Sequence, residues 1–401
     1  MTPFSKTQTA LLALISKSLG ATPDFDFCSL SDADWEQISL ESRAQTVDLI
    51  CFDATKGLNV PSSVAFQWLT KSAAIFSKNL KILKAQEKLC QLLSQNGLPY
   101  VILKGLASSH FYPLPENRNC GDVDFLVPDE FFDKADRLLI DSGYVKKDEH
   151  NENHEAYVLE GVEFEMHHAV AGIPEGANGD VFREYFKDVF ETSVADPTHG
   201  FIKPRDAAHG VVIFLHILHH VLSRGIGLRQ ICDWACFVSA TQKESFWDNE
   251  LLPLFKSAGL MKFCFIVTQV ATDYLGTPAP SWLVRVDETI PENFVRTVFE
   301  GGNFGQKNNL KAGTSLMVIK NSEKNSFETR IRLMIDKLNK TNHMMYPVLD
   351  KLPILYPFIM VWRVLRYIGL MLVGKRQSLS KVAKYANKRQ SQFEDFELFR
   401  F

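Results

Sequence analysis

Two aspartates separated by one residue carry the strongest chemical signal in this 401-residue sequence. Asp122 and Asp124 alternate with the apolar residues Val123 and Phe125. Side chains two residues apart in a β-strand point to the same face, so both carboxylates would lie together, opposite Val123 and Phe125. Two carboxylates this close repel each other unless a hard divalent cation lies between them. The pair therefore predicts a site for Mg²⁺, with Mn²⁺ as the alternative ion.

A later segment repeats this alternation. In residues 162–167, Glu163, Glu165 and His167 would share one face of a strand, and the apolar residues between them would share the other. If this strand neighbours the one that carries the aspartates, one of its carboxylates completes a three-carboxylate site. Two ions held there can clamp the attacking and leaving oxygens of an in-line phosphoryl displacement. Periodicity does not separate Glu163 from Glu165, because both point to the same side.

A glycine turn precedes the acidic pair. Lys104 and Gly105 would join a short apolar strand, residues 98–103, to a helix that begins near Leu106. Backbone N–H groups and the positive dipole end at the start of a helix can hold a triphosphate. The turn therefore adds a candidate phosphate site to the candidate metal site.

The elements that must position these residues form a small α/β unit in an otherwise helical chain. Apolar residues recur at helical spacing before residue 97, and residues 63–95 predict one long helix or two in series. Residues 154–159 and 162–168 predict a hairpin that turns at Glu160-Gly161. We therefore expect an α+β fold whose small mixed sheet lies between helical regions. The expected divisions are residues 1–97, 98–203 and 204–401.

Composition narrows the class of protein. Hydrophobic residues make up 46% and charged residues 23% of the chain, which is typical of a folded globular protein. The net charge of -3 gives no overall attraction to nucleic acid. The seven cysteines are scattered and form no CxxC pair, which favours reduced thiols and a cytoplasmic location. No GxSxG, Walker A or GxGxxG sequence supports a serine hydrolase, P-loop or Rossmann interpretation.

One apolar stretch reaches the length of a membrane span. Residues 352–373 contain Pro353, Pro357, Arg363 and Arg366, and the two arginines lie on one helical face. We therefore expect no transmembrane segment here and interpret the stretch as a helix packed on the protein. A weak contact with a membrane surface through residues 352–389 is the alternative interpretation.

The same motifs carry a family resemblance. The run Tyr100-Val-Ile-Leu-Lys-Gly105, then Gly121-Asp-Val-Asp-Phe-Leu-Val127 and Glu163-Phe-Glu-Met-His167, resembles the bacterial uncharacterised nucleotidyltransferase family of the polymerase-β superfold. Residues 216–234 also look like the helical region of that family. The resemblance implies that residues 98–203 are a nucleotidyltransferase core, with Asp122 and Asp124 as catalytic metal ligands and Glu165 as the third catalytic carboxylate and metal ligand.

The resemblance also implies substrates and contacts. The reaction would be Mg²⁺-dependent transfer of a nucleoside monophosphate from an NTP to a hydroxyl or phosphate acceptor. The acceptor would be a small molecule or glycan, with a protein or transfer RNA as the alternatives. The residues it assigns to the nucleotide are Lys104, Gly105, Ser108, Arg118 and His167.

Two features leave alternatives open. The superfold prefers Ser directly after the turn glycine, whereas this chain has Leu106, with Ser108 and Ser109 further on. This departure favours a non-catalytic module that keeps the fold and binds a nucleotide, glycan or protein. Arg229 and Asp233 lie four residues apart and predict an ion pair along one helix; the resemblance adds closure of the nucleotide cleft as an alternative role.

Overall fold

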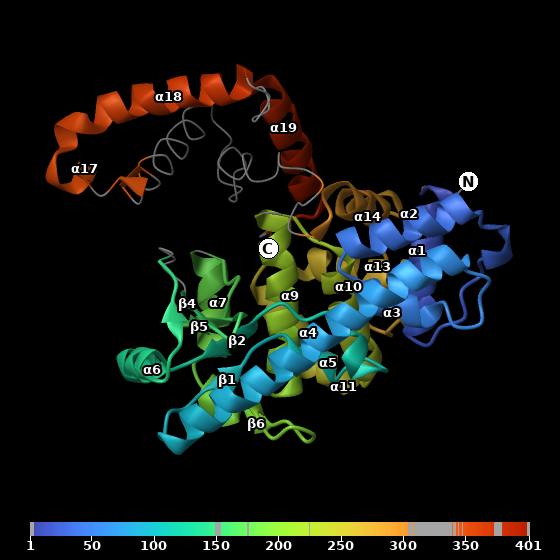
Figure 1. Cartoon of the computed structure of the whole chain (residues 1–401), viewed down its shortest axis with the longest axis horizontal. Helices are drawn as coiled ribbons and strands as arrows, with labels where there is room; N and C mark the ends of the chain where they lie inside the picture. The colour runs from blue at the N-terminus through green and yellow to red at the C-terminus, as the bar shows by residue number, and fades with distance from the viewer. Residues whose placement is uncertain are drawn as a thin grey trace. The chain divides into compact units, whose positions relative to one another are not determined.

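The computed structural model combines many helices with a small mixed β-sheet, which confirms the predicted α+β fold (Figure 1). It describes residues 4–148, 154–174, 176–223, 225–303, 307, 339, 342–343, 345–346, 348–372 and 379–398. Contacts divide the chain into two compact units, Met1–Lys307 and Asn308–Arg400. The boundaries expected after residues 97 and 203 both fall inside the first unit, so the three-part division stays a prediction.

Helices precede the sheet, as the apolar spacing predicts. They are α1 (Lys6–Ser18), α2 (Asp32–Ala44), α3 (Asp48–Ala54) and α4 (Ser62–Gln95). Of the two alternatives for residues 63–95, the structure has the single helix, which runs unbroken through the first unit in Figure 1. Its buried residues recur three and four apart, the spacing that places side chains on one helical face. They include Trp68, Asn79, Ile82, Gln86, Leu89 and Leu93.

Five strands form the sheet, in the order β1-β2-β5-β4-β3. Their bounds are β1 (Val101–Ile102), β2 (Val123–Leu126), β3 (Val145–Lys146), β4 (His154–Leu159) and β5 (Val162–His167). β2 and β5 run parallel, and the other neighbouring pairs are antiparallel. The predicted hairpin is confirmed as β4 and β5, and the predicted neighbourhood of the two acidic strands is confirmed by the β2–β5 pairing.

Apolar residues on alternate strand positions form the core of this sheet. Val123, Phe125, Phe164 and Met166 are buried in one cluster with residues of α4 and of α6 (Asp129–Asp141). A shift of one residue in either strand would turn these side chains out and the carboxylates in. Burial of the apolar face therefore fixes the register of the acidic face.

Helices follow the sheet in the first unit. They are α7 (Ala177–Tyr185), α8 (Val189–Thr192), α9 (Asp206–Leu222), α10 (Leu228–Ala240), α11 (Glu244–Phe246), the π-helical turn η3 (Trp247–Leu251), α12 (Leu252–Ser257), α13 (Met261–Leu275) and α14 (Thr289–Gly301). Short strands β6 (Val194–Ala195) and β7 (Ile202–Lys203) pair just before α9. α9 and α10 cross closely at Gly210, where the Phe237 ring occupies the space of a side chain.

Three helices and a 3₁₀ turn are described in the second unit. They are α17 (Val348–Lys351), η5 (Pro353–Leu355), α18 (Tyr356–Leu372) and α19 (Leu379–Asp395). Residues 373–378, part of the range 352–389 noted in the sequence, lie outside the described residues. None of the helices in the described part of the chain combines the length and hydrophobicity that crossing a membrane requires.

Gly210→Ala tests the crossing of α9 and α10. An added Cβ would lie 2.1 Å from Cζ and 2.5 Å from Cε1 of Phe237. Overpacking of this kind costs about 1–3 kcal/mol, so urea denaturation should show a lower free energy of unfolding by that amount. Gly121→Ala is the matched control, because its added Cβ has nothing within 4 Å. Equal losses in both variants would contradict the predicted close packing.

Candidate active site

Parallel pairing of β2 with β5 brings the three predicted carboxylates together. Asp124 lies directly beside Glu165 in the register of the two strands. One carboxylate oxygen from each of Asp122, Asp124 and Glu165 lies within 4.8 Å of the others. Oxygen ligands at such spacing are the kind that Mg²⁺ and Mn²⁺ prefer. The structure therefore assembles a set of donors that could hold a divalent cation.

Mutual repulsion shapes the ionisation of this cluster. Burial and the neighbouring charge of Asp124 raise the pKa of Asp122 from its ordinary value of 3.8 to about 6. Like-charged carboxylates that share a site cannot all ionise at low cost. Without a cation, Asp122 therefore gives up its charge before Asp124 as the pH falls.

Two side chains give Asp124 positive partners. Lys104 Nζ and His167 Nε2 both lie 2.9 Å from Oδ1 of Asp124. Burial by itself would raise the pKa of Asp124, but Lys104 and His167 outweigh it and hold that pKa below its usual range. Burial would lower the pKa values of both partners, and the carboxylates outweigh it and raise them. Asp124 is therefore the charged centre of the cluster.

Glu163 does not join this cluster. Its side chain is exposed, and its carboxylate forms an ion pair with Lys147. Glu165, two residues later on β5, lies 3.4 Å from His167 Nε2 through its Oε2 atom. The sequence leaves these two glutamates equivalent, whereas the structure places only Glu165 with Asp122 and Asp124.

The glycine turn packs against the acidic strand. Gly105 has φ 66° and ψ -117°, a conformation that residues with a Cβ avoid. A Cβ there would lie 3.4 Å from the backbone oxygen of Asp122. The adjacent Leu103 N–H donates to the carbonyl oxygen of Asp124 at 2.9 Å. These contacts hold the turn beside β2 and bring Lys104 to the Asp124 carboxylate.

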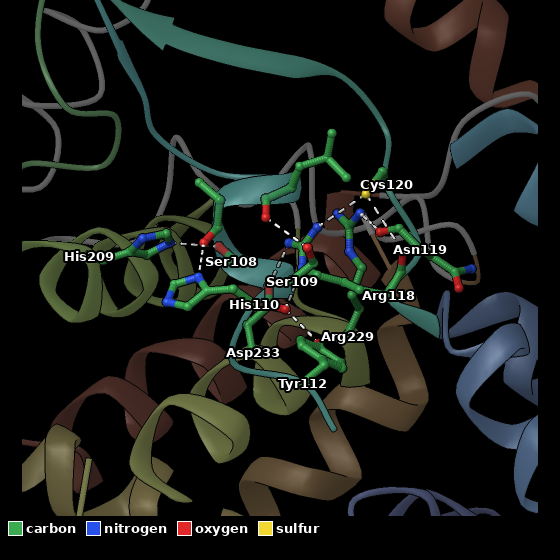
Figure 2. Close-up of polar contacts among 12 residues, drawn as sticks. Ser108, Ser109, His110, Tyr112, Arg118, Asn119, Cys120, His209, Arg229 and Asp233 are labelled. Atoms are coloured by element: carbon green, nitrogen blue, oxygen red, sulfur yellow. Dashed lines mark hydrogen bonds and ion pairs between the residues drawn. The ribbon is translucent and has the colours of Figure 1, made fainter. Parts of the chain in front are cut away.

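Residues after the turn face inward. α5 (Leu106–Ser109) begins with Leu106, which packs against the core cluster of the sheet. Ser108 is 1% exposed, and its hydroxyl is hydrogen-bonded to His209 Nε2 at 2.9 Å (Figure 2). The hydroxyl of Ser109 donates to the Leu106 carbonyl oxygen. A nucleotide contact by Ser108 stays a prediction, and the structure gives its hydroxyl a protein partner.

Arg118 anchors the loop that leads into β2. Figure 2 shows its guanidinium group directed at Asp233 of α10, with Nε 2.7 Å from Oδ1 and Nη2 2.8 Å from Oδ2. The Tyr112 hydroxyl donates to the same Oδ1 at 2.6 Å. All three side chains are buried. A role for Arg118 at the nucleotide stays a prediction, while its observed contacts tie the loop to the helical region.

The predicted ion pair between Arg229 and Asp233 is wrong. Asp233 binds Arg118 instead, and Arg229 Nη1 donates to the backbone oxygen of Asn119 at 3.0 Å. A carboxylate binds a guanidinium group most strongly when both of its oxygens accept hydrogen bonds from that group. Arg118, which is further from Asp233 in the sequence than Arg229 is, makes this contact here. Both arginines therefore hold the loop before β2. Arg118, which belongs to the loop, does so through its ion pair with Asp233, and Arg229 does so through its hydrogen bond to the loop backbone.

Two further residues near the site lie outside the site motifs predicted from the sequence. Asn79 of α4 donates to the Arg118 carbonyl oxygen at 2.8 Å and accepts from the Cys120 N–H at 3.0 Å. In the sequence, Asn79 is recognisable as an amide residue on the helical face of α4 that also carries Ile82 and Leu89, and all three are buried. His154 begins β4, and its Nε2 lies 3.7 Å from Glu165 Oε1. Its signal is its position opposite His167 once the hairpin turn is placed.

The sequence model of the uncharacterised nucleotidyltransferase family matches residues 31–276. The chain belongs to this family. The match covers the sheet with its carboxylate cluster and the helices α4 and α10, which anchor the loop before β2, and it confirms the resemblance. No curated protein matches the chain. Membership of a nucleotidyltransferase family implies a nucleotide as substrate.

In this member of the family, Asp122→Asn should stabilise the metal-free protein at neutral to basic pH. The raised pKa means that ionised Asp122 weakens the folded state above pH 3.8, fully so above about 6. The variant removes that charge, so its free energy of unfolding should exceed the wild-type value by about 1–3 kcal/mol near pH 8. The difference should vanish towards pH 3.8, where Asp122 is protonated in both states.

Urea denaturation in a chelating buffer across this pH range measures the difference. A variant that is no more stable than the wild type near pH 8 would contradict a repulsive carboxylate cluster.

Proposed function

We propose that this protein transfers a nucleoside monophosphate from an NTP to a hydroxyl or phosphate acceptor in a reaction that needs Mg²⁺ or Mn²⁺. The observation that supports the proposal is the meeting of Asp122, Asp124 and Glu165 within 4.8 Å, in a chain of a nucleotidyltransferase family. An acceptor oxygen attacks the α-phosphorus, the bond to the bridging oxygen of the β-phosphate breaks, and pyrophosphate leaves. A hydroxyl acceptor gives up its proton to solvent in this step, whereas an ionised phosphate acceptor has none to give up.

The donor set fits a hard divalent cation. Three carboxylates supply only oxygen, and the raised pKa of Asp122 reports a charge that lacks compensation. Asp122, Asp124 and Glu165 would hold the metal. When bound, the metal would stabilise negative charge on the transferred phosphoryl group and make the acceptor hydroxyl more acidic.

Three side chains of the protein can act on the phosphates, on Asp124 and on the acceptor. Lys104 is 14% exposed and its long side chain reaches Asp124 from the glycine turn, so it can move to a phosphate when a nucleotide binds. Its departure would leave Asp124 available as one of the residues that hold the metal. His167 donates to Asp124 from the neighbouring strand and can hold that carboxylate in position. Glu165 lies next to both and would orient the acceptor hydroxyl.

Substitution of the aspartates tests this proposal. Asp122→Asn and Asp124→Asn, alone and together, should lower metal-dependent NTP turnover by at least about 100-fold, because the charge stabilisation at the phosphoryl group is lost. Labelled NTPs incubated with the protein and a cell lysate measure the transfer, and the labelled fraction reports the class of acceptor. Pyrophosphate release measures the same step.

Glu163→Gln is the matched control. It removes a carboxylate from the same face of the same strand, but from an exposed ion pair with Lys147. We expect wild-type turnover from this variant and a large loss from Glu165→Gln. Turnover that persists in the double aspartate variant would refute the assigned site.

A second candidate function is a non-catalytic nucleotide-, glycan- or protein-binding module. Leu106 supports it, because its half-buried side chain packs against the core at the position where the superfold prefers a serine hydroxyl. The pairing of Asp124 with Lys104 supports it too, because this pairing neutralises a metal ligand without any metal.

Calorimetry with an NTP separates the two functions. The enzyme should bind NTP more tightly with Mg²⁺ than without it, by at least about tenfold, because the ion would offset the negative charge of both the phosphates and the carboxylates. The NTP affinities of the wild type and of Asp124→Asn should then differ only when Mg²⁺ is present. Absence of any NTP binding, with or without the ion, would favour a module for another ligand.

A further inference from the structure

A second set of possible metal ligands adjoins the carboxylate cluster. His154, Glu165 and His167 each offer one ligand atom, and these atoms lie within 4.8 Å of one another. His154 Nε2 is 3.7 Å from Glu165 Oε1, and His167 Nε2 is 3.4 Å from Glu165 Oε2. Each oxygen of Glu165 therefore faces one imidazole nitrogen. This set contains two nitrogens, whereas the set of Asp122, Asp124 and Glu165 contains none.

The strand register builds this arrangement. β4 begins at His154, β5 ends at His167, and the two residues lie directly opposite each other in the antiparallel pair. Side chains of opposite residues project from the same face of the sheet. The two imidazole rings have their centroids 5.0 Å apart. Glu165 lies two residues before His167 and so projects from that face as well. The backbone therefore places all three side chains together.

The chemistry of this set differs from that of the carboxylate cluster. Two imidazoles and one carboxylate suit Zn²⁺, Co²⁺, Ni²⁺ or Fe²⁺, whereas Mg²⁺ prefers oxygen alone. Ligands bound about 2.1 Å from one ion lie roughly 3 to 3.5 Å from each other. The observed separations of 3.4 and 3.7 Å, each to a different oxygen of Glu165, are close to this range.

We propose that His154, Glu165 and His167 form a transition-metal site, separate in selectivity from the carboxylate site and sharing Glu165 with it. The His167 nitrogen that now contacts Asp124 would bind the metal, so Asp124 would lose that hydrogen bond. The site requires no nucleotide and no transfer reaction, and it therefore goes beyond the proposed function. It predicts that the protein retains one transition-metal ion that excess Mg²⁺ does not displace.

Cobalt is the probe for this site, because Co²⁺ bound to imidazole absorbs visible light. The full-length, metal-free protein is titrated with Co²⁺ in excess Mg²⁺, which occupies oxygen-only sites. The wild type should bind one Co²⁺ with a visible spectrum. His154→Ala and His154→Gln should each weaken Co²⁺ binding by more than about tenfold, because each removes a direct ligand.

Two control variants make the result specific. His168→Ala removes the imidazole next to His167, but this ring stacks on Phe132 and binds Asp129, so Co²⁺ binding should stay at the wild-type level. Asp122→Asn changes only the carboxylate set, so it should keep Co²⁺ binding even if it abolishes transfer. Failure of the proposed transfer reaction and failure of this site therefore give different results.

The proposal is overturned by either of two outcomes. One is that excess Mg²⁺ removes all bound Co²⁺ from the wild type. The other is wild-type Co²⁺ affinity in both His154 variants, with circular dichroism showing that they are folded.

Discussion

The parallel pairing of β2 with β5 is the constraint on which the rest of the site depends. It places Asp124 beside Glu165 and keeps Asp122 on the same face. Two unit charges about 4 Å apart interact by roughly 4 kcal/mol at an effective dielectric constant near 20, far more than an exposed ion pair contributes. A cluster of three carboxylates is therefore unstable by itself. The positive charge of Lys104 and the hydrogen bond from His167 both offset this repulsion at Asp124. Asp122, which has no such contact with any residue that the structure describes, has the raised pKa.

Burial of the apolar side of the sheet keeps the carboxylates together despite their repulsion. Phe125 and Phe164 are fully buried against α4 and α6, and loss of a buried aromatic side chain from such a core typically costs about 3–5 kcal/mol. The same pleat that buries them directs the carboxylates to the other face. Repulsion between the carboxylates could be relieved by a shift of one strand, but that shift would expose the aromatic rings. Packing of the apolar side chains therefore outweighs the repulsion between the carboxylates, and the acidic face remains assembled.

The loop before β2 is held from two sides. Asn79 of α4 binds its backbone, and Asp233 of α10 binds Arg118 and Tyr112. Removal of one partner from a buried ion pair lowers the stability of a protein by several kcal/mol, because the other charge is left buried without a partner. The helical regions on either side of the sheet thus have a direct structural purpose, since they orient the segment that leads to Asp122. This agrees with a family match that extends well beyond the sheet, over residues 31–276.

Local patterns in the sequence determined the strand that begins directly after Asp122 and carries Asp124, the hairpin of β4 and β5, the helical character of residues 63–95 and the turn at Gly105, because each depends on residues close together in the chain. The tertiary structure decided which elements meet. It paired β2 with β5, which separates Glu165 from Glu163, and it gave Asp233 to Arg118, 115 residues away, in place of Arg229 on the same helix. It also buried Ser108 against His209 and set His154 opposite His167. Periodicity specifies the face on which a side chain lies, but the partner across the sheet or between helices follows from strand order and packing, which no local spacing encodes.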